Sequence, residues 1–249
     1  MLFIWTVVLI VWLYFRRMKQ RTDKRAMAER LILEYQLIAL KAQINPHFMS
    51  NCLSSIQNLI VNMKLHEAAD YISRFGLLVR KILDFSTRSL ITLEQELEIA
   101  SLYLELEQLR FKEKFEFRIV TEVIIDVSNC FVPALILNPI LENAVWHGLS
   151  SLRPGEQGRV EIRVTAIADE LHISVRDNGA GFINNKTNEG RARESKGILL
   201  IKQRLSSINS LYRISSARLM YEQMSEKAGE GKGTKAIIII PDNLDSLNR

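Results

Sequence analysis

Apolar and polar residues alternate with two different periods along this chain. Residues 16–63 show apolar side chains at spacings of two to four, which predicts a helix. A second helix is predicted over 66–85 and a third over 93–112. The first two, joined by a short turn, predict an antiparallel hairpin. Its apolar stripe is wide, so we expect a four-helix bundle formed by two chains, which would make the protein a homodimer.

After residue 112 the period changes, and short alternating segments predict strands. These strands are expected over 115–120, 159–164, 171–176, 218–223 and 234–240. Helices are expected over 133–147, begun by Pro133 in its first turn, and over 197–211, with a Gly-, Asn- and Lys-rich loop over 178–195. Because helices and strands follow each other without βαβ regularity, the predicted class is α+β, with a C-terminal α/β sandwich.

Residues 1–15 are continuously apolar apart from Thr6. Fifteen residues span about 22 Å as a helix, less than the roughly 30 Å of a bilayer core. Positive charge follows the run and no cleavage site is visible, which argues against a signal peptide. We therefore expect a membrane helix, the last span of a longer protein, with the Lys and Arg residues on the cytoplasmic side. The alternative is a hydrophobic tail in an interface.

Charge is concentrated beside this apolar run. Six basic residues and one acid between Arg16 and Arg25 account for the whole net charge of +5. The remainder is neutral on balance, which argues against direct nucleic-acid binding. A hydrophobic content of 47% excludes wholesale disorder. Cys52 and Cys130 are too few for a disulfide framework and fit a reducing compartment.

The string Asn45-Pro46-His47-Phe48 lies inside a predicted helix. Proline in a helix interior costs about 3 kcal/mol, and histidine is the side chain best suited to proton transfer or nucleophilic attack near neutral pH. The string therefore indicates either a kink that presents His47 to a partner or a helix boundary with a histidine cap.

Three further segments carry candidate chemistry. In Leu141–Gly148 the amide oxygen of Asn143 suits Mg²⁺, and Glu142 can orient a water or accept a proton. Asn143 and His147 would share a helical face, although a solvated polar face explains the same pattern. Asp177, at a strand end before Gly179 and Gly181, can accept a hydrogen bond from an exocyclic amine such as that of adenine, or the segment is an ordinary turn.

The third segment is Ser195-Lys196-Gly197, which opens a helix whose free amides can bind phosphate, unless it is a solvated basic loop. Basic side chains in and before it would complement phosphate charge: Lys186, Arg191, Arg193 and Lys196. Gly233-Thr234 before the last strand is a weaker signal of the same kind.

The order of these segments resembles the Bergerat ATP-binding fold. Residues 40–56, LKAQINPHFMSNCLSSI, resemble the signature of the LytS/YehU-type sensor histidine kinases. Residues 93–98 and 103–111 resemble that family's linker, and 137–143 its N box. The resemblance covers residues 33–241. The resemblance implies a location at a bacterial inner membrane, with the catalytic part in the cytoplasm. Together with the apolar and basic runs, it divides the chain into five parts: a membrane segment (1–15), a basic coiled-coil linker (16–32), dimerisation and phosphotransfer helices (33–112), an ATP-binding domain (113–241) and a tail (242–249).

The resemblance implies a protein histidine kinase of a two-component system, which uses ATP and Mg²⁺. His47 would be the phosphoacceptor, with Asn51 orienting its ring and Glu142 serving catalysis. The ATP site maps onto Asn143 (also the Mg²⁺ ligand), His147, Asp177, Gly179, Gly181, Lys196, Gly197 and Thr234. The phosphoryl group would pass to an aspartate of a response regulator, which in this family usually carries a LytTR-type DNA-binding domain.

Four positions depart from the pattern of such kinases. Phe48 stands where many histidine kinases carry an acid that serves as the base, which leaves the base unassigned. Ser50 replaces the family's usual Phe, Ser195 the first glycine of a Gly-x-Gly pair, and Leu200 a polar residue. The last two motivate an alternative, a degenerate ATP-binding regulator that acts through protein contacts. A gyrase-type ATPase without phosphotransfer is a third reading.

Overall fold

The computed structural model describes residues 5, 12, 16, 18–19, 46–111, 114–149, 152, 155–179, 196–224, 232–242 and 244. The chain forms two compact units, Met1–Pro46 and His47–Arg249. In the first, the Arg16 guanidinium lies 5.0 Å from the centroid of the Trp12 ring. No helix among the described residues is both long and apolar enough to cross a membrane. The predicted membrane helix lies outside them, apart from Trp5 and Trp12.

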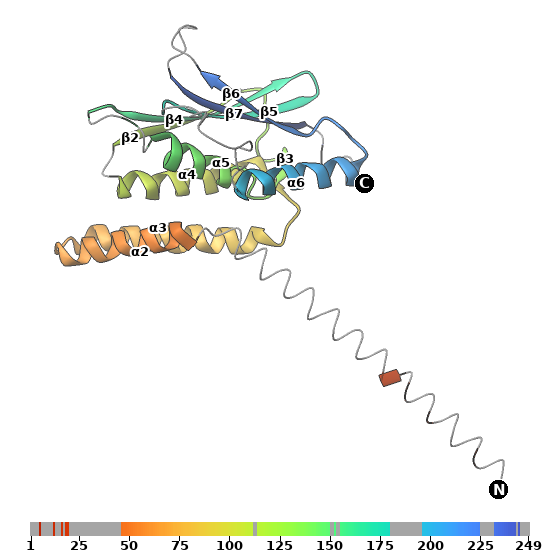
Figure 1. Ribbon diagram of the computed structural model, residues 1–249, viewed down its shortest axis with the longest axis horizontal. Coiled ribbons are helices and arrows are strands. Elements are labelled where there is room, and N and C mark those ends of the chain that lie inside the picture. The colour runs from red at the N-terminus through yellow and green to blue at the C-terminus, as the bar shows by residue number, and fades with distance from the viewer. Residues whose placement is uncertain are drawn as a thin grey trace, which may run out of the picture. The chain divides into compact units, whose positions relative to one another are not determined.

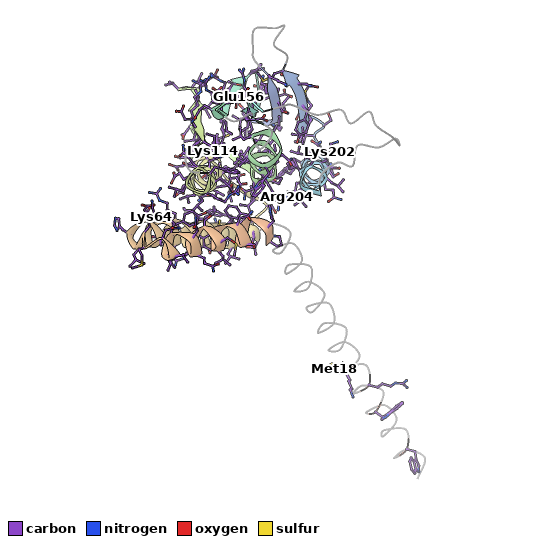
Figure 2. The ribbon with its side chains drawn as sticks, turned by 60° about the vertical axis from the view of Figure 1, so that its left-hand side comes forward. Met18, Lys64, Lys114, Glu156, Lys202 and Arg204 are labelled. Carbon is purple, nitrogen blue, oxygen red and sulfur yellow. The ribbon has the colours of Figure 1, made fainter. Side chains whose placement is uncertain are left out.

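Helices α2 (Pro46–Val61) and α3 (Leu65–Ser86) lie side by side as the predicted hairpin (Figure 1). Lys64 ends the turn between them (Figure 2). The earlier part of the predicted first helix, and with it any kink at Pro46, lies outside the described residues. Several large apolar side chains on the hairpin remain exposed: Leu53, Ile60, Val61, Met63, Leu65, Ile72, Leu77 and Leu83.

Helix α4 (Leu93–Arg110) lies between the hairpin and the sheet (Figure 1). It begins with a capping box, in which the Thr92 side chain and the Gln95 amide satisfy each other's backbone N–H groups. Two ion pairs join it to α3: Arg74 to Glu105 at 2.5 Å and Lys81 to Glu98 at 2.7 Å. Because α4 is covered on two sides, its buried residues include glutamates as well as leucines.

A five-stranded mixed sheet, in the order β2-β4-β5-β7-β6, forms the other layer. Only β2 and β4 pair in parallel. Its strands are β2 (Phe115–Thr121), β4 (Gly158–Ile167), β5 (Glu170–Asp177), β6 (Arg218–Met224) and β7 (Gly233–Pro241). Helices α4, α5 (Asn138–Asn143) and α6 (Lys196–Tyr212) cover one face (Figure 1). The predicted α/β sandwich, with its β4–β5 hairpin, is therefore confirmed.

Strand alternation explains which face is covered. On β4, Val160, Ile162 and Val164 are buried, whereas Arg159 and Arg163 are exposed.

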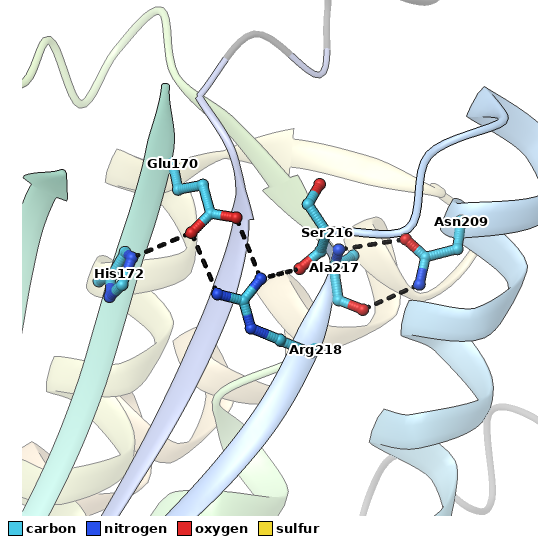
Figure 3. A network of polar contacts seen from close by, with 6 residues as sticks. All are labelled: Glu170, His172, Asn209, Ser216, Ala217 and Arg218. Carbon is cyan, nitrogen blue, oxygen red and sulfur yellow. Dashed lines mark hydrogen bonds and ion pairs between the residues drawn. The ribbon is translucent and has the colours of Figure 1, made fainter. Parts of the chain in front are cut away.

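At the opposite edge of the sheet, polar contacts hold β6 (Figure 3). Arg218 forms a bidentate ion pair with Glu170, at 3.0 and 3.2 Å. Asn209 on α6 exchanges two hydrogen bonds with the backbone of Ala217, which fixes the end of that helix against the strand.

The predicted helix over 133–147 is wrong at its start. Residues Phe131–Pro133 form a short strand, β3, which pairs antiparallel with β1 (Leu90–Thr92). Helix α5 begins five residues later, and Pro139 rather than Pro133 occupies its first turn. A π-helical turn, η1 (Ala144–Gly148), follows it. The face shared by Asn143 and His147 was inferred from α-helical spacing, which a π-turn does not keep.

Candidate functional site

The segment from α5 through η1 carries the polar residues of the predicted N box. Asn143 is half-buried, and its amide nitrogen is buried without a hydrogen-bond partner. A buried polar group left unpaired costs about 1–3 kcal/mol, so such an atom indicates a place for a ligand. Burial raises the pKa of the neighbouring Glu142, and the charge of Glu107 raises it further. π-turns are frequent at functional sites.

Asp177 ends β5 opposite Thr234 on β7. Its side chain is buried, and burial raises the pKa of its carboxyl to about 6 although the backbone amides of Gly179 and Thr234 oppose this. The Gly179 amide donates to its Oδ1 at 2.8 Å. A buried acid at a strand end, held by backbone donors and without a basic partner among the described side chains, suits a hydrogen-bonding ligand.

Three glycines let the backbone close around this carboxyl. A Cβ on Gly148 would lie 2.7 Å from Asp177 Oδ1, and one on Gly179 would lie 2.1 Å from the Gly148 carbonyl oxygen. Gly233 has a φ of +146°, and its Cβ would lie 1.9 Å from the Asp177 carbonyl oxygen. Sequence reasoning singled out Gly179, gave Gly233 only as a weak signal of phosphate binding, and assigned no role to Gly148, which ends the segment that it named.

The start of α6 reaches the same place. A Cβ on Gly197 would lie 2.8 Å from Cβ of Pro139, so this helix end packs against α5. The structure thus brings Gly197 beside the N box, and Asp177 beside Gly148, the last residue of η1. Gly181, the loop cations and the side chains of His147 and Lys196 lie outside the described residues. No group of three His, Cys, Asp or Glu among the described residues could hold a metal ion.

His47, in the first turn of α2, contacts this segment. The His47 side chain is exposed, and its ring centroid lies 4.3 Å from that of Trp146, with the ring planes tilted by 55°. Next to it, Phe48 is buried and lies 5.0 Å from Tyr103. Asn51 is half-buried, and its amide nitrogen makes no hydrogen bond, so it does not donate to the His47 ring in this structure.

Sequence reasoning missed Glu96 altogether. This carboxylate is completely buried and accepts hydrogen bonds of 2.8 Å from the amides of Leu135 and Leu137. Burial raises its pKa to about 7, against the opposing influence of those amides and of Arg204. Arg204, on α6 (Figure 2), donates to the Ala134 carbonyl. Leu135 has a φ of +57°, so these bonds hold a strained turn in front of α5.

Comparisons with known proteins agree with the geometry. Residues 35–115 match the histidine kinase family model. The chain is 29% identical to the sensor histidine kinase YesM of Bacillus subtilis over 183 residues, which is 73% of this chain and 30% of YesM. It is 28% identical to the sensor protein LytS of Bacillus cereus over 219 residues, 86% of this chain and 35% of LytS. The chain thus spans about a third of these relatives.

A solved structure also aligns with the chain. It is the histidine kinase domain of a blue-light activated kinase from Erythrobacter litoralis, with a TM-score of 0.45 and 18% identity. The alignment covers 88% of this chain and 97% of that domain. Together, the family model and the relatives confirm the predicted resemblance to the LytS-type histidine kinases.

Proposed function

We propose that this chain, a member of the LytS-type histidine kinases, phosphorylates its own His47 from Mg-ATP and passes the phosphoryl group to an aspartate of a response regulator. The observation that carries the proposal is the contact of His47 with Trp146. It places an exposed histidine ring against the segment that holds Glu142 and Asn143.

The nucleotide base has a fitting site at Asp177. Its buried carboxyl can accept a hydrogen bond from the exocyclic amine of adenine, which an apolar pocket could not satisfy. Gly148, Gly179 and Gly233 leave no side chains in the way of the surrounding backbone. Gly197 and Lys196 begin α6, whose N-terminal amides and dipole favour phosphate oxygens.

Asn143 is the residue that fits Mg²⁺. Mg²⁺ prefers oxygen ligands and is usually bound by only one or two protein groups together with waters and substrate phosphates. The amide oxygen of Asn143 is therefore a sufficient protein contribution. The buried amide nitrogen of the same side chain has no hydrogen-bond partner and, as a donor, suits a phosphate oxygen rather than the metal. The metal would neutralise the charge that develops on the phosphates.

The chemistry assigned to His47 needs positioning more than covalent help. A ring nitrogen attacks the γ-phosphorus with its lone pair as the bond to the bridging oxygen breaks, and ADP leaves with that electron pair. The proton on the other ring nitrogen must then depart. Phe48 cannot take it, and Glu142, whose pKa is raised by burial, is the nearest carboxyl in sequence to the contacting Trp146.

Dimerisation, membrane attachment and the response regulator complete the proposal. The exposed apolar side chains of α2 and α3, such as Leu53, Leu77 and Leu83, would be buried in a four-helix bundle of two chains. The apolar run of residues 1–15 would anchor the protein in the inner membrane. The response regulator would be of the LytTR type.

The test is labelling of the purified chain with γ-labelled ATP and Mg²⁺. The wild type should acquire phosphate that is lost in acid and stable in base, and His47→Ala should not. His66→Ala, an exposed histidine in the first turn of α3, is the matched control and should label as the wild type does. Equal labelling of His47→Ala would refute the acceptor. Binding of Mg-ATP in calorimetry without any labelling would favour the ATP-binding regulator instead.

A further inference from the structure

The contact between His47 and Trp146 restricts the histidine ring while its side chain stays exposed. The ring planes are tilted by 55°, so the two rings meet at an angle rather than face to face. The two ring centroids are 4.3 Å apart, and the His47 side chain is exposed in spite of this contact. Trp146 therefore restricts where the ring can lie, while the exposure of the side chain leaves His47 open to a substrate from solvent.

Trp146 is itself held from another side. The Arg110 guanidinium carbon lies 4.1 Å from the centroid of the Trp146 ring and 3.9 Å from that of Phe111. Phe111 also meets Trp146 edge to face, with centroids 6.1 Å apart. A planar cation over an aromatic face is an attractive contact, and it is stronger where water is excluded. The end of α4 thus fixes the tryptophan of η1.

Arg110 is fixed in turn by Glu107. Its Nε donates to Glu107 Oε2 at 2.8 Å, and its Nη2 donates to the same oxygen. The Glu107 side chain is fully buried and that of Arg110 is 16% exposed. Glu107 Oε1 and the nearby Tyr103 hydroxyl are buried without hydrogen-bond partners. An ion pair buried with an oxygen unsatisfied is a poor device for stability, which indicates that its use lies in positioning.

We propose that Trp146 is the platform that positions the His47 ring for phosphoryl transfer within its own chain, and that Arg110 and Glu107 hold this platform in place. This inference rests on the proposed kinase function. All four residues belong to the unit His47–Arg249, so the arrangement needs no second chain. Trp146 is thereby a positioning residue, since it acts through the histidine rather than on ATP.

The experiment compares Trp146→Leu and Trp146→Phe with the wild type in the full chain. We expect Trp146→Leu to lower kcat for autophosphorylation roughly tenfold or more, because a reacting group displaced by about 1 Å can lose up to 10²-fold in rate. KM for ATP should stay within about twofold, since the nucleotide residues are untouched. Trp146→Phe should recover most of the rate. Phe117→Leu, an aromatic residue of β2 outside this cluster, is the control.

A second readout does not depend on activity. In protein labelled with ¹³C-histidine, the ring protons of His47 should resonate upfield in the wild type because of the Trp146 ring current. Trp146→Leu should remove this displacement, and Arg110→Lys should reduce it, because an ammonium group cannot stack as a planar guanidinium does. The resonances of His66, on α3, should stay unchanged in both variants.

Three outcomes would overturn the inference. An unchanged kcat in Trp146→Leu would show that the ring needs no platform, and a raised kcat would make the contact inhibitory. A loss shared between kcat and KM, without rescue by Trp146→Phe, would indicate a merely structural role. If the wild type never labels although His47 shows the upfield displacement, the kinase function is refuted, and with it the role of Trp146 in transfer. The contact between the two rings would still be confirmed.

Discussion

The buried Asp177 carboxylate should lower the stability of the folded protein while it contributes to nucleotide binding. Replacing it should therefore change stability and binding in opposite directions. Burial raises its pKa from an ordinary 3.8 to about 6, a difference of about two pH units. At about 1.4 kcal/mol for each unit, the ionised carboxylate costs the folded protein about 3 kcal/mol. A carboxyl with a higher pKa in the folded state binds its proton more tightly there. Its contribution to stability is therefore complete below about pH 4 and is lost as the pH rises through about 6.

Asp177→Asn removes the charge and keeps the shape, so it removes this pH dependence. One backbone amide loses its acceptor in the variant, but that loss is the same at every pH. The quantity to measure is therefore a double difference: the change in free energy of unfolding between two pH values in the variant, minus the same change in the wild type. Relative to the wild type, the variant should gain about 2.5 kcal/mol in free energy of unfolding between pH 4 and pH 8, slightly less than the full difference because the unfolded carboxyl is already partly ionised at pH 4. It should also bind ATP at least about tenfold more weakly, because an amide NH₂ turned toward the adenine amine cannot accept its hydrogen bond.

Denaturant unfolding followed by Trp146 fluorescence measures this directly. The chain has three tryptophans, so a Trp5→Phe/Trp12→Phe background leaves Trp146 as the only reporter of the second unit. Asp84→Asn, an exposed carboxyl on α3, is the matched control and should shift the double difference by less than about 0.5 kcal/mol. A double difference below about 1 kcal/mol, or one of opposite sign, would show that Asp177 does not carry the desolvation cost assigned to it.

The remaining predictions concern the frame around the site. Gly233→Ala should destabilise the protein by more than about 1 kcal/mol, since its φ of +146° strains any side chain, and a thermal melt would show no change if the reasoning were wrong. Glu96→Ala should cost roughly 2–6 kcal/mol because two buried amides lose their acceptor, whereas Glu98→Ala at the exposed face of α4 should cost about 1 kcal/mol or less. Mixing His47→Ala chains with Glu142→Gln chains should give no labelling if transfer stays within one chain, and labelling of mixed dimers would contradict this.

Most of the regular elements could be predicted because their signals are local. The alternation of residues 159–164 and 171–176 reflects one buried and one solvated face, and both strands formed with their pairing as expected. The failed helix start at Pro133 has a non-local cause. A three-residue strand has no period of its own, and β3 exists because β1, about forty residues earlier, offers it a partner.

The sequence likewise did not predict which charged side chains are buried. Glu96 and Glu107 lie on the helix predicted over residues 93–112, and charged residues of an amphipathic helix ordinarily face water. The structure covers α4 on both sides, so these two acids are completely buried. Whether a glutamate on a helix meets water or backbone amides depends on which element packs against it, and spacing alone does not say this.

The buried acidic side chains lie around one short segment, which runs from the turn before α5 to Gly148. Among the described residues, the buried carboxylates are those of Glu96, Glu107 and Asp177. The first holds the turn before α5, the second holds Trp146 through Arg110, and the third is packed against Gly148. Each buried charge costs stability unless it is fully paired. A chain selected for stability alone would place apolar side chains there, so three such groups along one short segment indicate that its exact position matters for the proposed phosphoryl transfer.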